Sequence, residues 1–319
     1  MTDLSIIIVN YNTKKMLYDC VRSIVAQTGA CTYEIIVFDN NSGDGSADAV
    51  EAEFDCVRMI RSRENLGFAR ANNLAVMKAD GDRLLLLNPD TIVFDRAVER
   101  LNDFANQFPH AKIWGGRQLF EDGSLDHNCC RRFLNLWSLF CFAFGLAHAF
   151  PKNAVLNSEL YGGWRKDCVR PVEVIAGSFL LINRSLWEAL NGFDPIYFMY
   201  GEEVDLCRRA IAHGATPMFD PRSTIIHYGG RSETSAADRR IKLLKGHITF
   251  IKRHWHGPKL FWGLRMFRIL PLLRSIIYRA ASYVRPEHCS NAETWSRVWQ
   301  ARAIWMDGYS ASDHDRGER

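Results

Sequence analysis

Short apolar runs that alternate with helical patterns limit the possible folds of this chain more than any other feature. The apolar runs are short and rich in Ile, Leu and Val, as expected for buried strands. They lie at 4–9, 34–38, 57–60 and 83–87, and the helical patterns cover about 14–27, a segment from Ser46, and 69–78. Strands that alternate with helices predict an α/β fold with a mostly parallel, Rossmann-like sheet, because crossover helices connect parallel strands.

Polar clusters follow three of the apolar runs. In open α/β sheets, ligands bind beyond the carboxyl ends of the strands, so these clusters indicate a binding site at that edge. The alternative role of Asp39 is that of an N-cap for the helix that follows it. The polar residues are Asn10, Asn12, Asp39, Asn41, Asn88 and Asp90.

The second half of the chain has a less regular pattern. We expect one strand over Val172–Asn183, a short helix over Ser185–Leu190, a helix over Glu203–His213 and a short strand over Ser223–His227. The pattern shows no internal repeat and no low-complexity linker.

Composition limits the class of protein. Of 319 residues, 47% are hydrophobic and 24% charged, so the chain can bury a large core and is not intrinsically disordered. Nine cysteines without a Cys-x-x-Cys pair indicate neither a disulfide framework nor a zinc ribbon. Because no run of about 18 uncharged apolar residues occurs, we expect no membrane-spanning helix, and the N-terminus does not resemble an export signal.

The net charge of +4 is unevenly distributed. Residues 239–285 contain twelve Lys and Arg and no Asp or Glu, interleaved with aromatic and aliphatic side chains. This segment is too apolar for a nucleic-acid surface and fits an amphipathic region on an anionic membrane, kinked or divided at Pro271. A second apolar stretch, 133–150, has basic flanks that include Arg131 and Lys152 and supports the same interpretation. The alternative is a pair of helices that pack on the main domain with their arginines in water.

Several motifs, in order, resemble a known family. The chain is similar to inverting glycosyltransferases of family 2, which have the GT-A fold, and most of all to bacterial rhamnosyltransferases. The resemblance covers about residues 4–255. Its motifs are Ile6–Asn12, Val37–Ser46, Asn65–Asn73, Leu87–Asp90, Gly177–Ile182, Gly192–Asp194, Phe198–Arg209 and His227–Ser232.

The resemblance implies a domain organisation and a set of binding residues. It predicts a GT-A domain at 1–255, with a nucleotide-sugar half at about 1–110 and an acceptor half at 111–255. A helical region at 256–319 then associates with a membrane or forms oligomers. The residues that the resemblance assigns to the nucleotide-sugar are Asn10, Asn12, Asp39, Asn41, Asn65, Gly67, Asn72, Asn88, Asp90 and Arg231.

The resemblance also implies a divalent cation, Mg²⁺ or Mn²⁺. Asp90 matches the carboxylate that binds the metal in the family, and His227 matches a second ligand of the metal or phosphate. The cation would neutralise charge on the departing diphosphate. Asn88 stands where many GT-A enzymes have the first acid of Asp-x-Asp, so one carboxylate is available here. Taken alone, a histidine such as His227 is more often structural.

Two glutamates open a predicted helix, where carboxylates are in any case favoured by the helix dipole. The resemblance implies that the second, Glu203, is the general base that deprotonates the acceptor hydroxyl, with Glu202 as a residue that shares this role. Most relatives have Asp at the position of Glu203, so this chain differs by one methylene. Single displacement by the hydroxyl would invert the anomeric centre.

The function implied is transfer of L-rhamnose from dTDP-L-rhamnose to a hydroxyl of a polyprenyl-diphosphate-linked glycan, for cell-surface polysaccharide synthesis. The enzyme would act as a peripheral protein at the cytoplasmic face of the inner membrane. Alternatives are another UDP- or GDP-sugar donor, a sugar-phosphate nucleotidyltransferase, and a scaffold subunit with a decayed site, which Asn88 and Glu203 favour. A nucleotidyltransferase would have a basic, Gly-rich loop where Asn10–Thr13 stands. We expect no nucleic-acid partner, and a homo-oligomer stays open.

Overall fold

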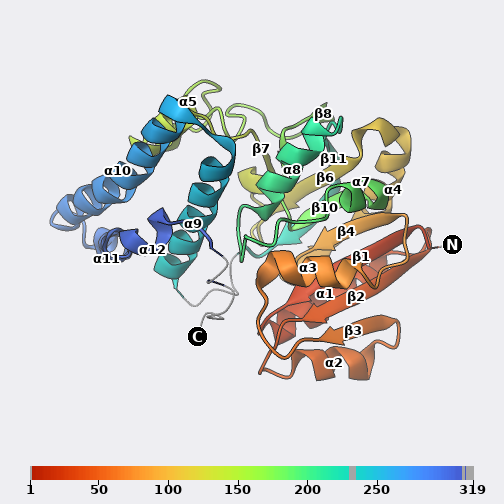
Figure 1. The fold of residues 1–319 in the computed structure, drawn as a ribbon. Helices are drawn as coiled ribbons and strands as arrows, with labels where there is room; N and C mark the ends of the chain where they lie inside the picture. The colour runs from red at the N-terminus through yellow and green to blue at the C-terminus, as the bar shows by residue number, and fades with distance from the viewer. Residues whose placement is uncertain (1, 230–234, 311–312, 314–319) are drawn as a thin grey trace.

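The computed structural model describes residues 2–229, 235–310 and 313, and it confirms the α/β fold (Figure 1). The centre of the molecule is a nine-stranded sheet in the order β3-β2-β1-β4-β10-β6-β11-β5, with β8 paired to β11. These strands are β1 (Leu4–Asn10), β2 (Tyr33–Asp39), β3 (Val57–Arg61), β4 (Arg83–Leu87), β5 (Thr91–Val93), β6 (Ile113–Leu119), β8 (Arg170–Pro171), β10 (Phe179–Asn183) and β11 (Met218–His227).

The first four strands of the sheet are parallel, as the alternating pattern predicts. Helices α1 (Lys14–Gln27), α2 (Ser46–Glu53) and α3 (Gly67–Val76) connect them and agree with the predicted segments to within two residues. The register places Asn10 opposite Asp39. The polar clusters that follow β1 and β2 therefore meet at one edge of the sheet.

The prediction of one strand over Val172–Asn183 is wrong. The segment contains β9 (Val174–Ile175), which pairs with β7 (Cys130–Arg131) in a separate two-stranded sheet, and then β10 in the main sheet. Between them lies Gly177, where a Cβ would be 3.5 Å from the Cβ of Glu203, so this segment packs against the helix that begins at Glu202. The strand predicted at Ser223–His227 is the end of β11, which begins at Met218 and changes register between Asp220 and Thr224.

Helices cover both faces of the sheet, and a hydrophobic core lies on each face. The helices that follow the fourth strand and flank the sheet are α4 (Ala97–Gln107), α7 (Arg184–Ala189) and α8 (Glu202–Ala212). Helix α8 contributes Leu206, Cys207 and Ala210 to one of the two cores, which fixes its N-terminus beside β9. The predicted helices at 185–190 and 203–213 are thus confirmed, each shifted by one residue.

A third core lies beside the sheet and belongs mainly to the C-terminal helices (Figure 1). Helix α10 runs without interruption through the buried Pro271 and packs on α11 and α5, so of the two expectations for this segment, a kink or a division at Pro271, the division is wrong. No helix among the described residues is long and apolar enough to cross a membrane. The helices are α5 (Leu136–Ala143), α6 (Leu146–Ala149), α9 (Ala236–His254), α10 (Gly257–Ser282), α11 (Cys289–Gln300) and α12 (Arg302–Met306).

Candidate active site

The carboxyl ends of β1 and β2 hold a network of short polar side chains. The side-chain amide of Asn10 lies 2.8 Å from Asp39 Oδ1 and 2.7 Å from Ser46 Oγ. The other carboxylate oxygen of Asp39 accepts a hydrogen bond from the backbone N–H of Ser42 at 3.0 Å. Asn10 is fully buried and Asp39 almost so. The two side chains therefore shape the loop after β2 as a unit.

Two asparagines in these loops adopt left-handed backbone conformations, which asparagine tolerates better than most residues. Asn12 has φ 52° and Asn41 has φ 66°. Both side chains are exposed. Asn12 Oδ1 accepts a hydrogen bond from Gly43 N–H at 2.9 Å. The loops after β1 and β2 thus bond to each other above the sheet edge.

The turn before α3 is tied to the segment that leads into α8. Asn65 Oδ1 accepts hydrogen bonds from Asn40 Nδ2 and from Gly67 N–H. Gly67 has φ 76°, and a Cβ there would collide with the carbonyl oxygen of Phe198, so only glycine fits. Asn72 is buried in α3 and donates to Phe68 O, so its side chain is used within its own helix.

Three residues from distant segments form what we call the histidine corner: Asp90, Asp126 and His227. His227 Nε2 lies 3.3 Å from Asp90 Oδ1, and Nδ1 lies 3.9 Å from Asp126 Oδ2. Neither ring nitrogen makes a hydrogen bond within the described part of the chain, although both are buried. Burial favours the neutral ring, but the carboxylates of Asp90 and Asp126 outweigh it and raise the pKa of His227 above its ordinary value of 6.5.

A second group, the arginine corner, consists of Arg131, Glu202 and Glu203. Arg131 Nη2 donates to Glu203 Oε1 at 2.5 Å, and Gly201 N–H donates to Glu203 Oε2 at 3.2 Å. Glu202 is buried, and its Oε2 has no hydrogen-bond partner among the described residues. Burial and the negative charge of Glu203 raise the pKa of Glu202 well above its ordinary value.

One loop connects the two corners. Asn88 N–H, two residues before Asp90, donates to Ser178 O at 3.2 Å. The neighbouring Gly177 packs against the side chain of Glu203. Cys129 O accepts from Ala176 N–H at 3.1 Å. The segment 176–178 therefore lies between the two corners and places both at the same edge of the sheet.

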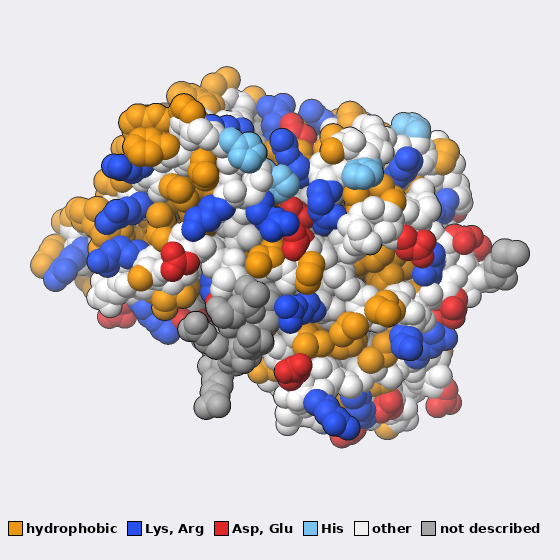
Figure 2. All heavy atoms as spheres, in the orientation of Figure 1, with side chains coloured by type: hydrophobic (Ala, Val, Ile, Leu, Met, Phe, Trp, Pro, Cys, Tyr) orange, Lys and Arg blue, Asp and Glu red, His pale blue; other side chains and the backbone are white. Residues whose placement is uncertain are grey.

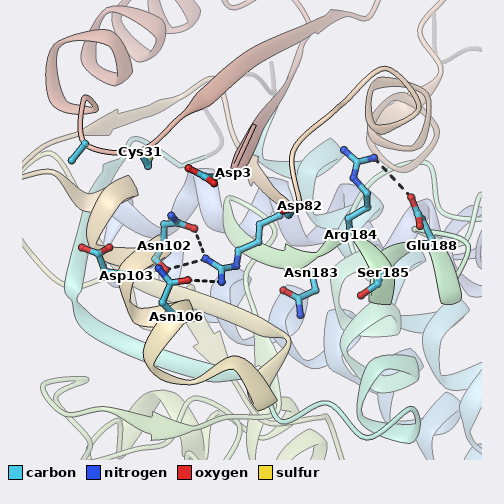
Figure 3. A pocket seen from close by; sticks show the side chains of 12 residues that line it. Asp3, Cys31, Asp82, Asn102, Asp103, Asn106, Asn183, Arg184, Ser185 and Glu188 are labelled. Carbon is cyan, nitrogen blue, oxygen red and sulfur yellow. Dashed lines mark hydrogen bonds and ion pairs between the residues drawn. The ribbon is translucent and has the colours of Figure 1, made fainter. Parts of the chain in front are cut away.

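The larger of the two cavities described lies elsewhere. It has a volume of about 690 Å³, and its lining includes Asp3, Asp82, Arg83 and Asn183 (Figure 3). Asp3 precedes β1 and Asp82 precedes β4, so this cavity is at the amino ends of the parallel strands. Its central guanidinium, that of Arg83, is already bonded to Asn102 and Asn106. Since ligands of such sheets bind at the opposite edge, we place the candidate site at the two corners.

The histidine corner fits a divalent cation that also binds a substrate. Carboxylate oxygen and imidazole nitrogen suit Mn²⁺, and two buried ring nitrogens without hydrogen bonds among the described residues are consistent with a ligand that the protein alone does not supply. Within the described ranges, no group of three or more side chains converges closely enough to hold an ion by itself. Cations of this kind complete their coordination with phosphate oxygens and water.

Sequence reasoning missed Asp126 and the role of Arg131. Asp126 reaches His227 across 101 positions and Arg131 reaches Glu203 across 72, so no local pattern connects them. By sequence, Arg131 belongs to the basic flank of an apolar stretch, whereas in the structure its side chain points inward and is 19% exposed. The predicted residue Arg231 lies outside the described residues.

Comparison with known proteins shows the family to which this chain belongs. Residues 5–167 match the family model described as glycosyl transferase family 2. The chain is 28% identical over 293 residues to an N-acetylglucosaminyl-diphospho-decaprenol L-rhamnosyltransferase of Mycobacterium tuberculosis H37Rv, covering 83% of this chain and 90% of the relative. It is 29% identical over 212 residues to the rhamnosyltransferase WbbL of Escherichia coli K12, covering 64% of this chain and 72% of the relative.

Among solved structures, the fold is similar to a mannosyltransferase of Pyrobaculum calidifontis in complex with GDP-mannose and Mn²⁺. The TM-score is 0.58 at 15% identity, covering 95% of this chain and 87% of that one. At this identity the likeness supports the GT-A fold alone. The family model covers half of the chain, and the relatives align over most of it, so this protein belongs to glycosyl transferase family 2 and is a rhamnosyltransferase-like glycosyltransferase.

Proposed function

We propose that this glycosyltransferase transfers L-rhamnose from dTDP-L-rhamnose, with inversion, to a hydroxyl of a polyprenyl-diphosphate-linked glycan. The observation that carries the proposal is the pair of corners on either side of residues 176–178. One contains a carboxylate and an imidazole suited to a cation, and the other contains a fixed carboxylate suited to a base. The names of the two rhamnosyltransferase relatives support the sugar, and the mycobacterial name supports the lipid-linked acceptor.

The loops after β1, β2 and β3 would bind the nucleotide. Asp39 has acceptor capacity left on its carboxylate for the pyrimidine N3–H or a ribose hydroxyl, and exposed Asn12 and Asn41 border it. Asn10 and Asn72 would shape these loops from within, because both are buried and bonded to protein.

Asp90 and His227 would hold the cation, with Asn88 beside them, and Arg231 would contact the diphosphate. The cation supplies positive charge where the leaving diphosphate becomes more negative. Because the described part of the protein offers few ligands, we expect tight binding of the cation only together with the nucleotide.

Glu203 would act as the base. As the acceptor oxygen bonds to the anomeric carbon, the bond from that carbon to the diphosphate oxygen breaks, and the diphosphate takes the electron pair. The hydroxyl proton moves to the Glu203 carboxylate, which Arg131 and Gly201 N–H hold in place. Glu202, which is buried and has a raised pKa, would pack beside Glu203 rather than accept the proton.

The surface formed by α5 and α10 would contact an anionic membrane. Figure 2 shows hydrophobic side chains over this part of the molecule, with Lys and Arg among them. Arg274 of α10 donates to Phe142 O of α5, so two segments remote in sequence form one face. Helix α10 contains five Lys and Arg and no acid. The exposed hydrophobic residues of α5, the residue that follows it and α10 are Trp137, Phe142, Phe144, Phe261, Trp262, Ile269, Ile276 and Ile277.

Sedimentation with vesicles tests the membrane contact. We expect binding to vesicles of phosphatidylcholine and phosphatidylglycerol, weaker binding to phosphatidylcholine alone, and loss of binding in Phe261→Glu/Trp262→Glu. If the wild type ignores both vesicles and forms a dimer that the same variant disrupts, the surface is an interface between copies and the membrane proposal is wrong.

A thermal-shift screen of nucleoside diphosphates and their sugars, with and without Mn²⁺, tests the donor site. We expect dTDP species to stabilise the wild type more than UDP or GDP species, only with Mn²⁺, and not to stabilise Asp90→Ala. Asp103→Ala, in the cavity at the opposite edge, should respond like the wild type. A preference for GDP or UDP species would refute the rhamnose donor. Binding of dTDP without turnover of any sugar nucleotide on any glycolipid would favour a scaffold.

A further inference from the structure

Asp126 is held so that one of its oxygens faces His227. Its Oδ1 accepts two hydrogen bonds from Asn128, from the backbone N–H at 2.8 Å and from the side-chain amide at 2.9 Å. Its Oδ2 is the atom that lies 3.9 Å from His227 Nδ1. The carboxylate is buried, and the loop that carries it is anchored by a hydrogen bond from Asp126 N–H to Gln118 O. Asn128 thus fixes the orientation of the carboxylate independently of His227.

The imidazole has a carboxylate on each side. Asp90 faces Nε2 and Asp126 faces Nδ1. An imidazole that offers the lone pair of Nε2 to a cation must carry its proton on Nδ1, and that proton needs an acceptor in a buried site. Asp126 Oδ2 is in the right place, since a ring movement of about 1 Å would bring it to hydrogen-bond distance.

We infer that Asp126 is a positioning residue that accepts the Nδ1 proton of His227 and thereby directs Nε2 toward the cation beside Asp90. Asp126 does not itself touch the ion, because the imidazole lies between the two carboxylates. The inference rests on the proposed cation site. It makes the segment after β6 part of donor binding, although no residue of that segment belongs to the motifs that carry the family resemblance.

The substitution Asp126→Asn tests this role sharply. The two N–H groups of Asn128 require an acceptor, so they would keep the oxygen of the introduced amide in the place of Oδ1. The nitrogen of that amide would then face His227 as a donor. The imidazole could accept a hydrogen bond from this amide N–H only with a lone pair on Nδ1. The ring proton would then sit on Nε2, and Nε2 would have no lone pair to offer the cation.

Two measurements follow. In ¹⁵N NMR of protein without metal, at a pH above the pKa of His227, we expect the Nδ1–H tautomer in the wild type and the Nε2–H tautomer in Asp126→Asn; His227→Gln assigns the signals. In titrations of Mn²⁺ with dTDP present, followed by electron paramagnetic resonance of free Mn²⁺, Asp126→Asn should bind about 10- to 100-fold more weakly. Asp126→Glu, which keeps an acceptor, should recover part of this loss.

The control is Asp122→Asn, in the same loop, where the carboxylate is exposed and bonds to Ser124. We expect wild-type affinity and the wild-type tautomer. If Asp126→Asn keeps the Nδ1–H tautomer or binds Mn²⁺ as tightly as Asp122→Asn, the inference is wrong while the cation site stands. If the wild type binds no Mn²⁺ with dTDP, the proposed cation site itself is wrong.

Discussion

The histidine corner and the arginine corner both bury carboxylates, but they satisfy them differently. In the histidine corner, His227 stands between two carboxylates and its ring nitrogens make no hydrogen bond within the described residues. In the arginine corner, Glu203 receives a guanidinium N–H and a backbone N–H, one on each oxygen. Among the described residues, the first corner thus leaves both ring nitrogens of its histidine without a hydrogen bond, whereas the second holds Glu203 within the protein and leaves only Glu202 Oε2 without one.

This difference separates two kinds of chemistry at one edge of the sheet. A site that lacks partners for buried polar atoms gains stability when a ligand supplies them. A carboxylate that is already held by two donors is oriented before any substrate arrives, which suits a group that must accept a proton at a fixed place. Three predictions for the arginine corner test this difference, from the largest effect to the smallest.

The largest effect is expected on turnover. Glu203→Gln removes the proton acceptor but keeps the shape, so kcat should fall by about 10²- to 10⁴-fold. The thermal shift by dTDP with Mn²⁺ should be unchanged, because the proposed site of that ligand is the other corner. Glu53→Gln, an exposed glutamate at the end of α2, serves as the control and should keep wild-type turnover. If Glu203→Gln transfers sugar at the wild-type rate, Glu203 is not the general base.

The next effect concerns stability. Arg131→Met leaves the largely buried Glu203 with only the backbone N–H of Gly201 as a donor, and breaking such a pair costs up to about 3–5 kcal/mol. The two side chains are 19% and 12% exposed, so solvent replaces little of the lost interaction. Urea unfolding should show this loss, and Arg131→Met/Glu203→Gln should recover much of it.

The matched control for Arg131 is Arg100→Met. Arg100 pairs with Asp95 at the surface, with side chains 42% and 59% exposed, so its loss should cost about 0–1 kcal/mol. Equal losses for the two variants would mean that the arginine corner is as open to water as the surface pair.

The fold of the first half could be predicted from sequence because its signals are local. The runs that became β1 to β4 are bounded by polar clusters, and each connecting helix lies directly between its strands. The failure at 172–183 has a tertiary cause. Val174 and Ile175 are apolar enough to continue into β10, but they pair with Cys130 and Arg131, and nothing near them in sequence indicates this.

The site was predictable only in part, for a related reason. Asp90, His227, Glu202 and Glu203 belong to motifs that resemble a family, and the structure places each of them at the same sheet edge. Their immediate partners do not belong to those motifs. Asp126 and Arg131 come from the segment around β7, where the nearby apolar stretch suggested a membrane contact instead. Long-range contacts decide which charges meet, and one sequence does not record them.

The smallest effect distinguishes the two glutamates of the arginine corner by pH. Burial and the charge of Glu203 raise the pKa of Glu202 above its ordinary 4.5. Between pH 4.5 and the raised value, the folded chain keeps a proton that the unfolded chain has released, so this group lowers stability as the pH rises. In Glu202→Gln this loss of stability with rising pH does not occur, because the amide does not ionise. This variant should equal the wild type below about pH 4.5 and be more stable than the wild type at pH 7 in urea unfolding.

Glu99 in α4 provides a control of opposite sign. Burial tends to raise the pKa of Glu99, but hydrogen bonds from Gly29 N–H, Ala30 N–H and Arg96 outweigh it and lower the pKa below 4.5. This carboxylate therefore stabilises the fold above that pH, and its contribution is lost as the pH falls through the lowered value. Glu99→Gln should be less stable than the wild type at pH 7, with a difference that shrinks in acid. If Glu202→Gln instead follows Glu99→Gln, Glu202 is ionised and bonded in the folded protein, and it could share the role of base.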